Sequence, residues 1–230
     1  MRFTCEKSML VQALNIASRA VASKSSLTVI EGILCRAEKE LSFTGYNMET
    51  GITYTVEADI SDPGKCILPA RLFSDIIRRL PEGPVTVVVD ESYKVSIRAG
   101  YASFTISAES ADDYPELPDV GAGRRVSIPQ QRLKELISGT IFAVSENQGR
   151  PIHTGVKFEV EEELISAIAG DGNELEIGFN VRYLADALRV IPSEEVTLEL
   201  TNGLSPIVLT PVDDKMDFAY MILPVRIKNG

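Results

Sequence analysis

Apolar and polar residues follow two different periods along this chain. In four segments the apolar residues recur every three or four positions, which places them on one face of a helix. These segments are residues 9–23, 70–81, 132–145 and 181–192. Elsewhere apolar and polar residues alternate, which is typical of a half-buried antiparallel strand. In the first half of the chain the expected strands are residues 28–37, 40–45, 52–58, 65–69, 85–89, 94–98 and 102–108.

Two of the predicted helices superpose without gaps. Residues 70–81, ARLFSDIIRRLP, match residues 181–192, VRYLADALRVIP, at a constant offset of 111. The identical pairs are Arg71 and Arg182, Asp75 and Asp186, Arg78 and Arg189, and Pro81 and Pro192. The apolar positions that correspond are Phe73, Ile77 and Leu80 in the first helix, and Leu184, Leu188 and Ile191 in the second. Their spacing puts them on one face, which we expect to be buried, and proline ends both helices.

A second correspondence lies upstream of the first. Residues 9–23 and 132–145 each follow a short strand and lead into an extended segment, in which Gly32 and Gly155 match at an offset of 123. Because the offset then falls to 111, the second unit lacks twelve residues between these landmarks. A strand with its turn takes about ten residues. The second unit is therefore predicted to be one strand short.

The repeat divides the chain into two parts. Residues 110–125, SADDYPELPDVGAGRR, are rich in turn-forming residues and are predicted to link two domains. We expect an α+β fold with a first domain at residues 1–120 and a second at residues 121–230. Each domain should carry its helices on one face of antiparallel sheets.

Composition narrows the function without defining it. The chain has 230 residues, 44% of them hydrophobic, and a net charge of −10. This charge argues against a surface that is basic all over, but it permits a separate basic face. No apolar run is long enough to span a bilayer and the N-terminal residues lack a signal core, so we expect a cytoplasmic protein without a membrane partner. The three cysteines have no metal-ligand spacing, and no catalytic motif accompanies the single histidine, so neither a cofactor nor enzyme activity is expected.

Several segments resemble a known family. They include MRFTCEKSMLVQALNIASRAV at residues 1–21, ILPARLFSDIIRRLPEGPVTVVVD at residues 67–90, TIFAVSENQGRPIHTGVKFEVE at residues 140–161 and the tail YMILPVRI at residues 220–227. These segments are similar to the bacterial DNA polymerase III beta subunit, the sliding clamp. The resemblance implies a subunit of three similar domains, with two subunits forming a ring of six domains around duplex DNA. It implies a DNA-replication processivity factor without catalytic activity.

The chain departs from that family in length. Residues 1–120 resemble the first clamp domain, residues 124–160 the first half of the second, and residues 173–227 the second half of the third. The second domain is therefore predicted to be a hybrid clamp-type domain that lacks one strand. The junction has two readings, since residues 159–170 fit an acidic edge strand of the third domain and residues 164–175 fit the second domain. Three two-domain subunits would also supply six domains, so a trimer is an alternative to the dimer of the family.

The resemblance implies basic residues that line the central hole and attract phosphates without reading sequence. The candidates are Lys24, Arg78, Arg79, Arg132, Lys134, Asn147, Arg150, Arg182 and Arg189. An ordinary solvated helix face is the alternative interpretation of these residues.

The resemblance also implies an apolar pocket for short peptide motifs of partner proteins. The expected partners are the catalytic subunit of DNA polymerase III, the clamp loader and other proteins with clamp-binding motifs. The candidate residues are His153, Gly172, Leu175, Met221, Leu223, Pro224, Val225 and Arg226. A buried last strand is the alternative interpretation of the tail.

Two strand edges are candidates for subunit contacts, because exposed edges invite pairing. The first is residues 101–107, with Tyr101, Ser103 and Ile106, and the second is an acidic edge with Glu159, Glu161, Glu162 and Glu163. The alternative function is a shortened, non-encircling clamp fragment that acts as a protein-interaction module.

Overall fold

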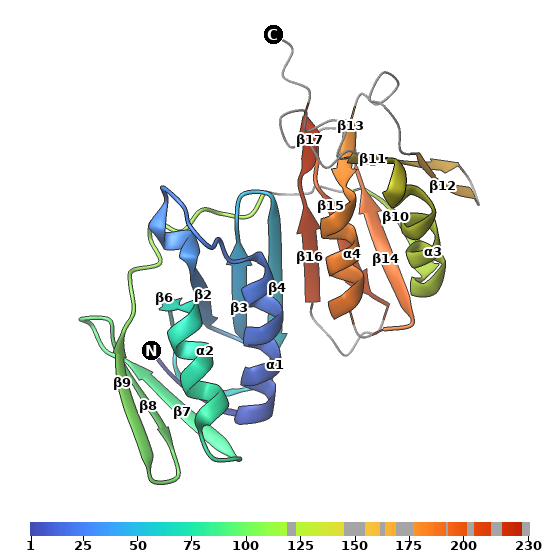
Figure 1. Ribbon diagram of the computed structural model, residues 1–230. Coiled ribbons are helices and arrows are strands. Elements are labelled where there is room, and N and C mark those ends of the chain that lie inside the picture. Colours follow the sequence, from blue (N-terminus) through green and yellow to red (C-terminus); the bar gives the residue numbers. More distant parts are fainter. Residues whose placement is uncertain are drawn as a thin grey trace. The chain divides into compact units, whose positions relative to one another are not determined.

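The computed structural model divides the chain into two compact units, Met1–Leu117 and Pro118–Gly230 (Figure 1). It describes residues 1–118, 123–144, 155–161, 164–168, 177–191, 193–201, 205–212 and 218–226. Each unit combines antiparallel sheets with two α-helices. The expected α+β class is therefore confirmed. No helix in the described ranges has the length and apolar character needed to cross a membrane.

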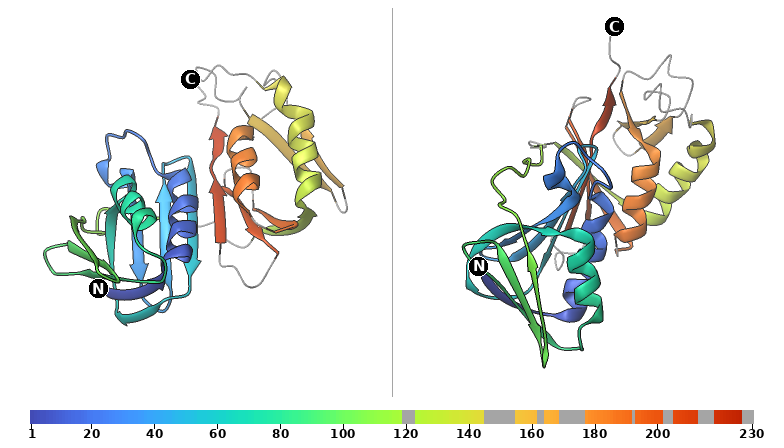
Figure 2. Two further views of the ribbon diagram at one scale, coloured as in Figure 1. Left: turned by 60° about the horizontal axis from the view of Figure 1, so that its bottom comes forward. Right: turned by 60° about the vertical axis from the view of Figure 1, so that its left-hand side comes forward.

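The first unit contains two sheets and two neighbouring helices. Its strands are β1 (Arg2–Glu6), β2 (Gly32–Ala37), β3 (Leu41–Tyr46), β4 (Thr50–Val56), β5 (Asp59–Asp62), β6 (Gly64–Pro69), β7 (Pro84–Val89), β8 (Lys94–Ala99) and β9 (Ala102–Ser107). One sheet has the order β5-β1-β7-β8-β9, and β4, β3, β2 and β6 pair in the other. Helices α1 (Lys7–Ala17) and α2 (Ala70–Arg79) lie side by side against the strands (Figure 2).

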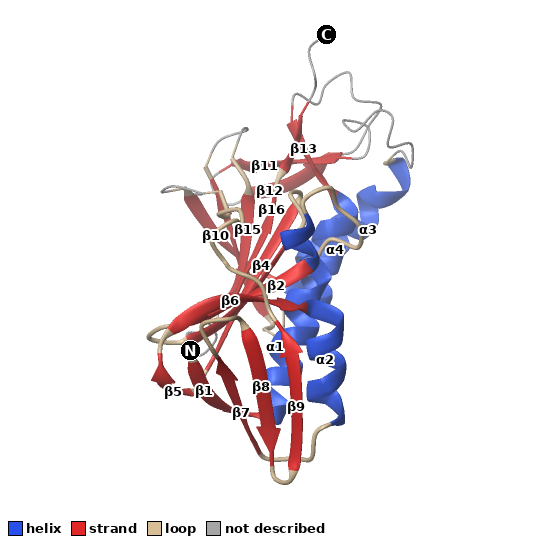
Figure 3. Ribbon diagram, turned by 90° about the vertical axis from the view of Figure 1, so that its left-hand side faces the viewer, coloured by secondary structure: helices blue, strands red, loops and turns tan. Residues whose placement is uncertain are grey.

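The second unit repeats this plan with fewer strands in the described ranges. Its strands are β10 (Arg124–Pro129), β11 (Gly155–Glu161), β12 (Leu164–Ile168), β13 (Ile177–Asn180), β14 (Glu195–Leu200), β15 (Ile207–Pro211), β16 (Phe218–Ile222) and β17 (Pro224–Arg226). Strands β10, β14, β15 and β16 pair in one sheet, and the other has the order β12-β11-β13-β17. Helices α3 (Gln130–Thr140) and α4 (Val181–Val190) pack together. Within each unit the helices occupy one side of the strands (Figure 3).

The repeated helices bury the expected faces. Phe73, Ile77 and Leu80 of the first unit are at most 3% exposed. Their counterparts Leu184, Leu188 and Ile191 are at most 4% exposed, so the predicted core face is confirmed in both helices. The polar residues Arg71, Arg78, Arg182 and Arg189 are exposed on the other side of these helices.

The strands that follow α1 and α3 differ in number among the described residues. Five strands, β2 to β6, lie between α1 and α2. Between α3 and α4 the described residues form three strands, β11, β12 and β13, and residues 145–154, 162–163 and 169–176 lie outside the described ranges. The shortfall of one strand in the second unit therefore stays a prediction.

The structure corrects one expected element of the first unit and adds one that was not expected. Residues 28–37 are not one strand, because Thr28–Glu31 form a 3-10 helix before β2 begins. The amide of Ile30 donates to the carbonyl of Leu27, and the amide of Ser25 donates to the Glu31 carboxylate at 2.8 Å, so local hydrogen bonds replace strand pairing there. Strand β5 has the largely exposed sequence DISD, and it lacked the alternation needed for prediction.

Candidate DNA-binding and partner-binding surfaces

The outward face of the first helix pair carries basic side chains. Arg71, Arg78 and Arg79 are exposed on α2, and the last two lie in its final turn, where a cation interacts favourably with the helix dipole. The Arg78 guanidinium donates to the Asn15 amide oxygen of α1 at 2.6 Å and lies 3.4 Å from the Asp75 carboxylate. Arg78 therefore links the two helices while keeping its cation at the surface.

Basic residues of the second helix pair have acidic neighbours one turn away. Arg132 lies 2.9 Å from the Glu135 carboxylate, and Arg189 lies 2.6 Å from Asp186. The Arg132 guanidinium holds the pKa of Glu135 below its usual value, with a further hydrogen bond from Gln131. These exposed pairs leave the side chains in water, where each contributes little to folding stability.

The remaining candidates for DNA contact have different positions. Lys24 is exposed in the segment between α1 and the 3-10 helix, and Arg182 is exposed in the first turn of α4. Lys134 is half-buried and donates to the Gln130 side chain. Asn147 and Arg150 lie outside the described residues. The structure thus brings Arg78 and Arg79 together on α2, and places Arg132 and Lys134 on α3.

The C-terminal tail forms the last two described strands. Met221 of β16 is 9% exposed and pairs with Val208 of β15, so this side chain belongs to the core. Leu223, Pro224 and Val225 are half-buried, and Gly178 of β13 pairs with Val225. Arg226 ends β17. The proposed opposite wall, His153, Gly172 and Leu175, lies outside the described residues.

Strand β9 is an outer strand of its sheet. Tyr101, in the turn before it, is 97% exposed, Ser103 is exposed and Ile106 is half-buried. Phe104, which the sequence reasoning missed, is 42% exposed. The alternation of Ala102, Phe104 and Ile106 is the signal that could have found it, since these three residues share one face of the strand.

The acidic edge is placed differently from the expectation. Glu159 and Glu161 lie in β11, where they pair with Ser166 and Leu164 of β12. The outermost strand is therefore β12, and the glutamate-bearing strand lies one position inside the sheet. Glu162 and Glu163 lie outside the described residues.

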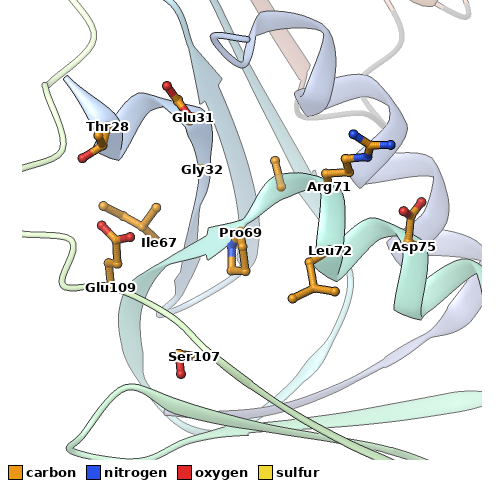
Figure 4. A pocket seen from close by; sticks show the side chains of 11 residues that line it. Thr28, Glu31, Gly32, Ile67, Pro69, Arg71, Leu72, Asp75, Ser107 and Glu109 are labelled. Carbon is orange, nitrogen blue, oxygen red and sulfur yellow. The ribbon is translucent and has the colours of Figure 1, made fainter. Parts of the chain in front are cut away.

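A hollow of about 500 Å³ lies in the first unit, where β6 leads into α2 (Figure 4). Ile67, Pro69 and Leu72 supply apolar surface, Ser107 comes from the end of β9, and Glu109 comes from the segment after it. Sequence reasoning missed this pocket because its walls come from segments that are far apart along the chain. No local motif marks such a convergence.

The cysteines occupy the core of the first unit. Cys35 and Cys66 face each other across β2 and β6, and both are free and buried. A hydrogen bond between them, together with burial, raises the pKa of Cys35 well above its usual value. In the described part of the chain, no three His, Cys, Asp or Glu side chains are grouped to hold a metal ion.

Comparison with known families identifies the architecture. Residues 1–118 match the N-terminal domain of the DNA polymerase III beta subunit, and residues 154–226 match its C-terminal domain. The chain belongs to the DNA polymerase III beta subunit family. Members of this family are non-catalytic subunits of the polymerase, so the prediction that the chain is not an enzyme is confirmed. The C-terminal match begins at residue 154, before the ambiguous junction at residues 159–175 and inside the range that was expected to resemble the second clamp domain.

Relatives in this family are longer than this chain. The beta sliding clamp of Bacillus subtilis is 35% identical over 184 residues, which cover 76% of this chain and 49% of the relative. The beta sliding clamp of Halalkalibacterium halodurans is 27% identical over 238 aligned positions, covering 100% of this chain and 56% of that protein. The crystal structure of the DNA polymerase sliding clamp from Bacillus subtilis superposes with a TM-score of 0.88 at 26% identity, covering 100% of this chain and 66% of that one. The chain thus spans about half the length of the curated relatives it matches.

Proposed function

We propose that this protein is a DNA-replication processivity factor that encircles duplex DNA in the cytoplasm and tethers the polymerase to it. Such a protein performs no bond chemistry, because topological linkage alone keeps the polymerase at a high effective concentration near its template. The observation that carries the proposal is the basic outward face of α2 in a chain that belongs to the beta subunit family. Arg78 and Arg79 can attract phosphates of any sequence from that face.

The proposed ring is built from two-domain subunits. The first domain is the N-terminal clamp domain, and the second is a hybrid that joins the start of one clamp domain to the end of another. Three such subunits supply six domains, and the outer strand β9 with Tyr101 and Phe104 is the contact offered to a neighbouring subunit. The partner edge in the second unit is β12, the outermost strand of its sheet.

The proposed partners reach the ring through short peptide motifs. The half-buried apolar residues Leu223, Pro224 and Val225 are suited to one wall of a groove for an extended peptide. The DNA polymerase III catalytic subunit, the clamp loader and other proteins with clamp-binding motifs are the expected owners of such peptides. Met221 is buried, and in this proposal it supports the wall from the core side.

A second candidate function is a non-encircling protein-interaction module. Two observations favour it. The chain has about half the length of the curated relatives, and three described strands lie between α3 and α4 where the first unit has five between α1 and α2. A fragment of this kind would bind partner peptides or full-length clamp subunits without enclosing DNA.

Retention on circular DNA distinguishes the two functions. The protein is incubated with clamp loader and ATP on nicked circular plasmid, separated from free protein by gel filtration, and the plasmid is then cut with a restriction enzyme. An encircling clamp remains with the circle in 0.5 M NaCl and is lost after linearisation, because threading and not phosphate attraction holds it. Equal retention on circular and linear DNA, or none on either, would contradict the encircling function.

A further inference from the structure

The hollow at the start of α2 has an apolar floor inside an acidic rim (Figure 4). Ile67, Pro69 and Leu72 form the floor. Leu72 is 50% exposed, whereas Phe73, Ile76 and Ile77 of the same helix are buried. An exposed leucine beside a hollow offers apolar area that a ligand can cover.

Three acidic side chains surround this floor, and the single basic side chain of the lining neutralises only part of their negative charge. Glu31 comes from the 3-10 helix, Asp75 from α2, and Glu109 from the segment after β9. Arg71 is the single cation of the lining, and in Figure 4 it lies with Asp75 on the side of the hollow away from Glu109. The side with Glu31 and Glu109 is therefore electronegative, which favours a basic group.

The backbone around the hollow is held in place. The amide of Ile67 donates to the Glu109 carbonyl at 2.9 Å, and the amide of Glu109 donates to the Ile67 carbonyl at 3.0 Å. The Glu31 carboxylate accepts from the Ser25 amide at 2.8 Å, which fixes the direction of that side chain. A site whose walls are fixed before binding loses less entropy when its ligand arrives.

The internal repeat gives this hollow a counterpart in the second unit. At the offset of 111, Ile67 corresponds to Gly178, and Gly178 pairs with Val225 of the tail as Ile67 pairs with Glu109. In the first unit the segment after β9 pairs with β6, which precedes α2, and in the second unit β17 pairs with β13, which precedes α4. The residue at this position is glutamate in the first unit and valine in the second, so the two positions differ in charge and polarity.

We propose that the hollow of the first unit is a second peptide-binding site, which takes a short extended segment of a partner protein with a basic residue next to an apolar one. The apolar side chain covers Leu72 and Pro69, and the basic side chain lies near Glu109 and Glu31. This site is separate from the tail in the second unit and does not depend on ring closure. Its charge selects against acidic segments, because these would bring like charges together.

Peptide binding to the full chain tests this site. The probe is a fluorescein-labelled, capped hexapeptide of alternating leucine and lysine, and its affinity is measured by fluorescence anisotropy in 0.15 M NaCl. We expect Leu72→Asn to weaken binding about tenfold through loss of apolar contact. Glu109→Gln should weaken it about threefold through loss of one exposed charge pair. The same hexapeptide with glutamate in place of lysine should bind at least tenfold more weakly.

Matched variants separate this site from general attraction to an acidic protein. Glu91→Gln removes an equally exposed carboxylate from the β7–β8 turn, outside the hollow, and should leave the affinity unchanged. Met48→Asn removes an apolar side chain that is 52% exposed and lies outside the hollow, and it should also leave the affinity unchanged. The proposal is overturned if Glu91→Gln weakens binding as much as Glu109→Gln, if Met48→Asn weakens it as much as Leu72→Asn, or if the lysine peptide fails to bind at millimolar concentration.

Discussion

At the scale of single residues, the first unit depends on a few close contacts between elements. Tyr114 is 7% exposed, and its hydroxyl donates to the Thr44 carbonyl of β3 at 3.2 Å. This bond ties the segment that leaves the first unit to the middle of a sheet. Burial raises the pKa of Tyr114 well above its usual value, because the phenolate would lose its hydration.

The buried phenol predicts a loss of stability at high pH. Since the pKa of Tyr114 is higher in the folded than in the unfolded chain, its contribution is fully present below the unfolded value of about 10 and is lost as the pH rises above it. Tyr114→Phe should cost about 1 kcal/mol at pH 7 through the missing hydrogen bond. Urea unfolding of both proteins between pH 8 and pH 11 should show a flatter pH profile for the variant. The remaining slope is due to Cys5, Cys35, Tyr46 and Tyr54, whose pKa values are also raised in the folded chain. Parallel profiles would contradict this account.

A glycine allows α1 to approach β3 closely. A Cβ atom added to Gly45 would lie 2.1 Å from the carbonyl oxygen of Ala17, and a backbone atom cannot move aside as a side chain can. Gly45→Ala should therefore lower the free energy of unfolding by about 2 kcal/mol, measured by urea titration. Gly139→Ala is the matched control, because a Cβ there meets nothing within 4 Å and alanine favours the helix. Equal stability losses in both variants would argue against the close approach as the cause.

At the scale of elements, the sequence predicted those helices and strands in which apolar residues recur at regular spacing. The apolar faces of residues 70–81 and 181–192 were read directly from their spacing, because burial on one side of a helix imposes it. The 3-10 helix Thr28–Glu31 and strand β5 were missed, since short polar elements leave no such period. The outermost position of β12 and the walls of the hollow were also missed, because they depend on pairing between distant segments.

The basic end of α2 should determine part of the salt dependence of DNA binding. In the described part of the chain no ion pair is seen for Arg79, whereas Arg78 is held by Asn15 and Asp75. If Arg79 contacts a phosphate, Arg79→Gln should reduce the slope of log K against log salt concentration by about 0.9. Filter binding to a 30-base-pair duplex between 50 and 200 mM NaCl measures this slope. Lys94→Gln removes one cation from β8, outside the helix layer, and should leave the slope unchanged; a similar change in both variants would speak against phosphate contact by α2.

At the scale of the whole molecule, ring closure depends on edges that belong to different units. The repeat and the family resemblance predicted two units and a shortened second one, because both rest on long stretches of sequence. The resemblance implied a dimer or a trimer and two candidate edges, but it could not decide between these assemblies, since the choice depends on the geometry of two exposed edges and not on any local pattern.

The proposed trimer predicts a definite mass in solution. Light scattering at micromolar concentration should give three times the chain mass of 25.1 kDa. Phe104→Lys places a charge on the outer strand β9 and should yield the monomer, because the lysine would be buried without a partner. Met48→Lys alters a side chain that is 52% exposed but lies between β3 and β4, and should leave the trimer intact. A monomer for the unaltered protein would rule out the trimeric ring.

The ion pairs on the helices bear on how fast a ring of this kind could move. Arg78, Arg132 and Arg189 each have a carboxylate three residues away along their own helix. A phosphate that approaches one of these arginines competes with an anion already present, so each contact is shallow and is easily exchanged for the next along the strand. In the proposed ring these carboxylates would act as built-in counterions and lower the friction against the duplex. Asp75→Asn or Asp186→Asn should then slow diffusion along DNA and raise the affinity for it, which single-molecule tracking on stretched DNA would measure.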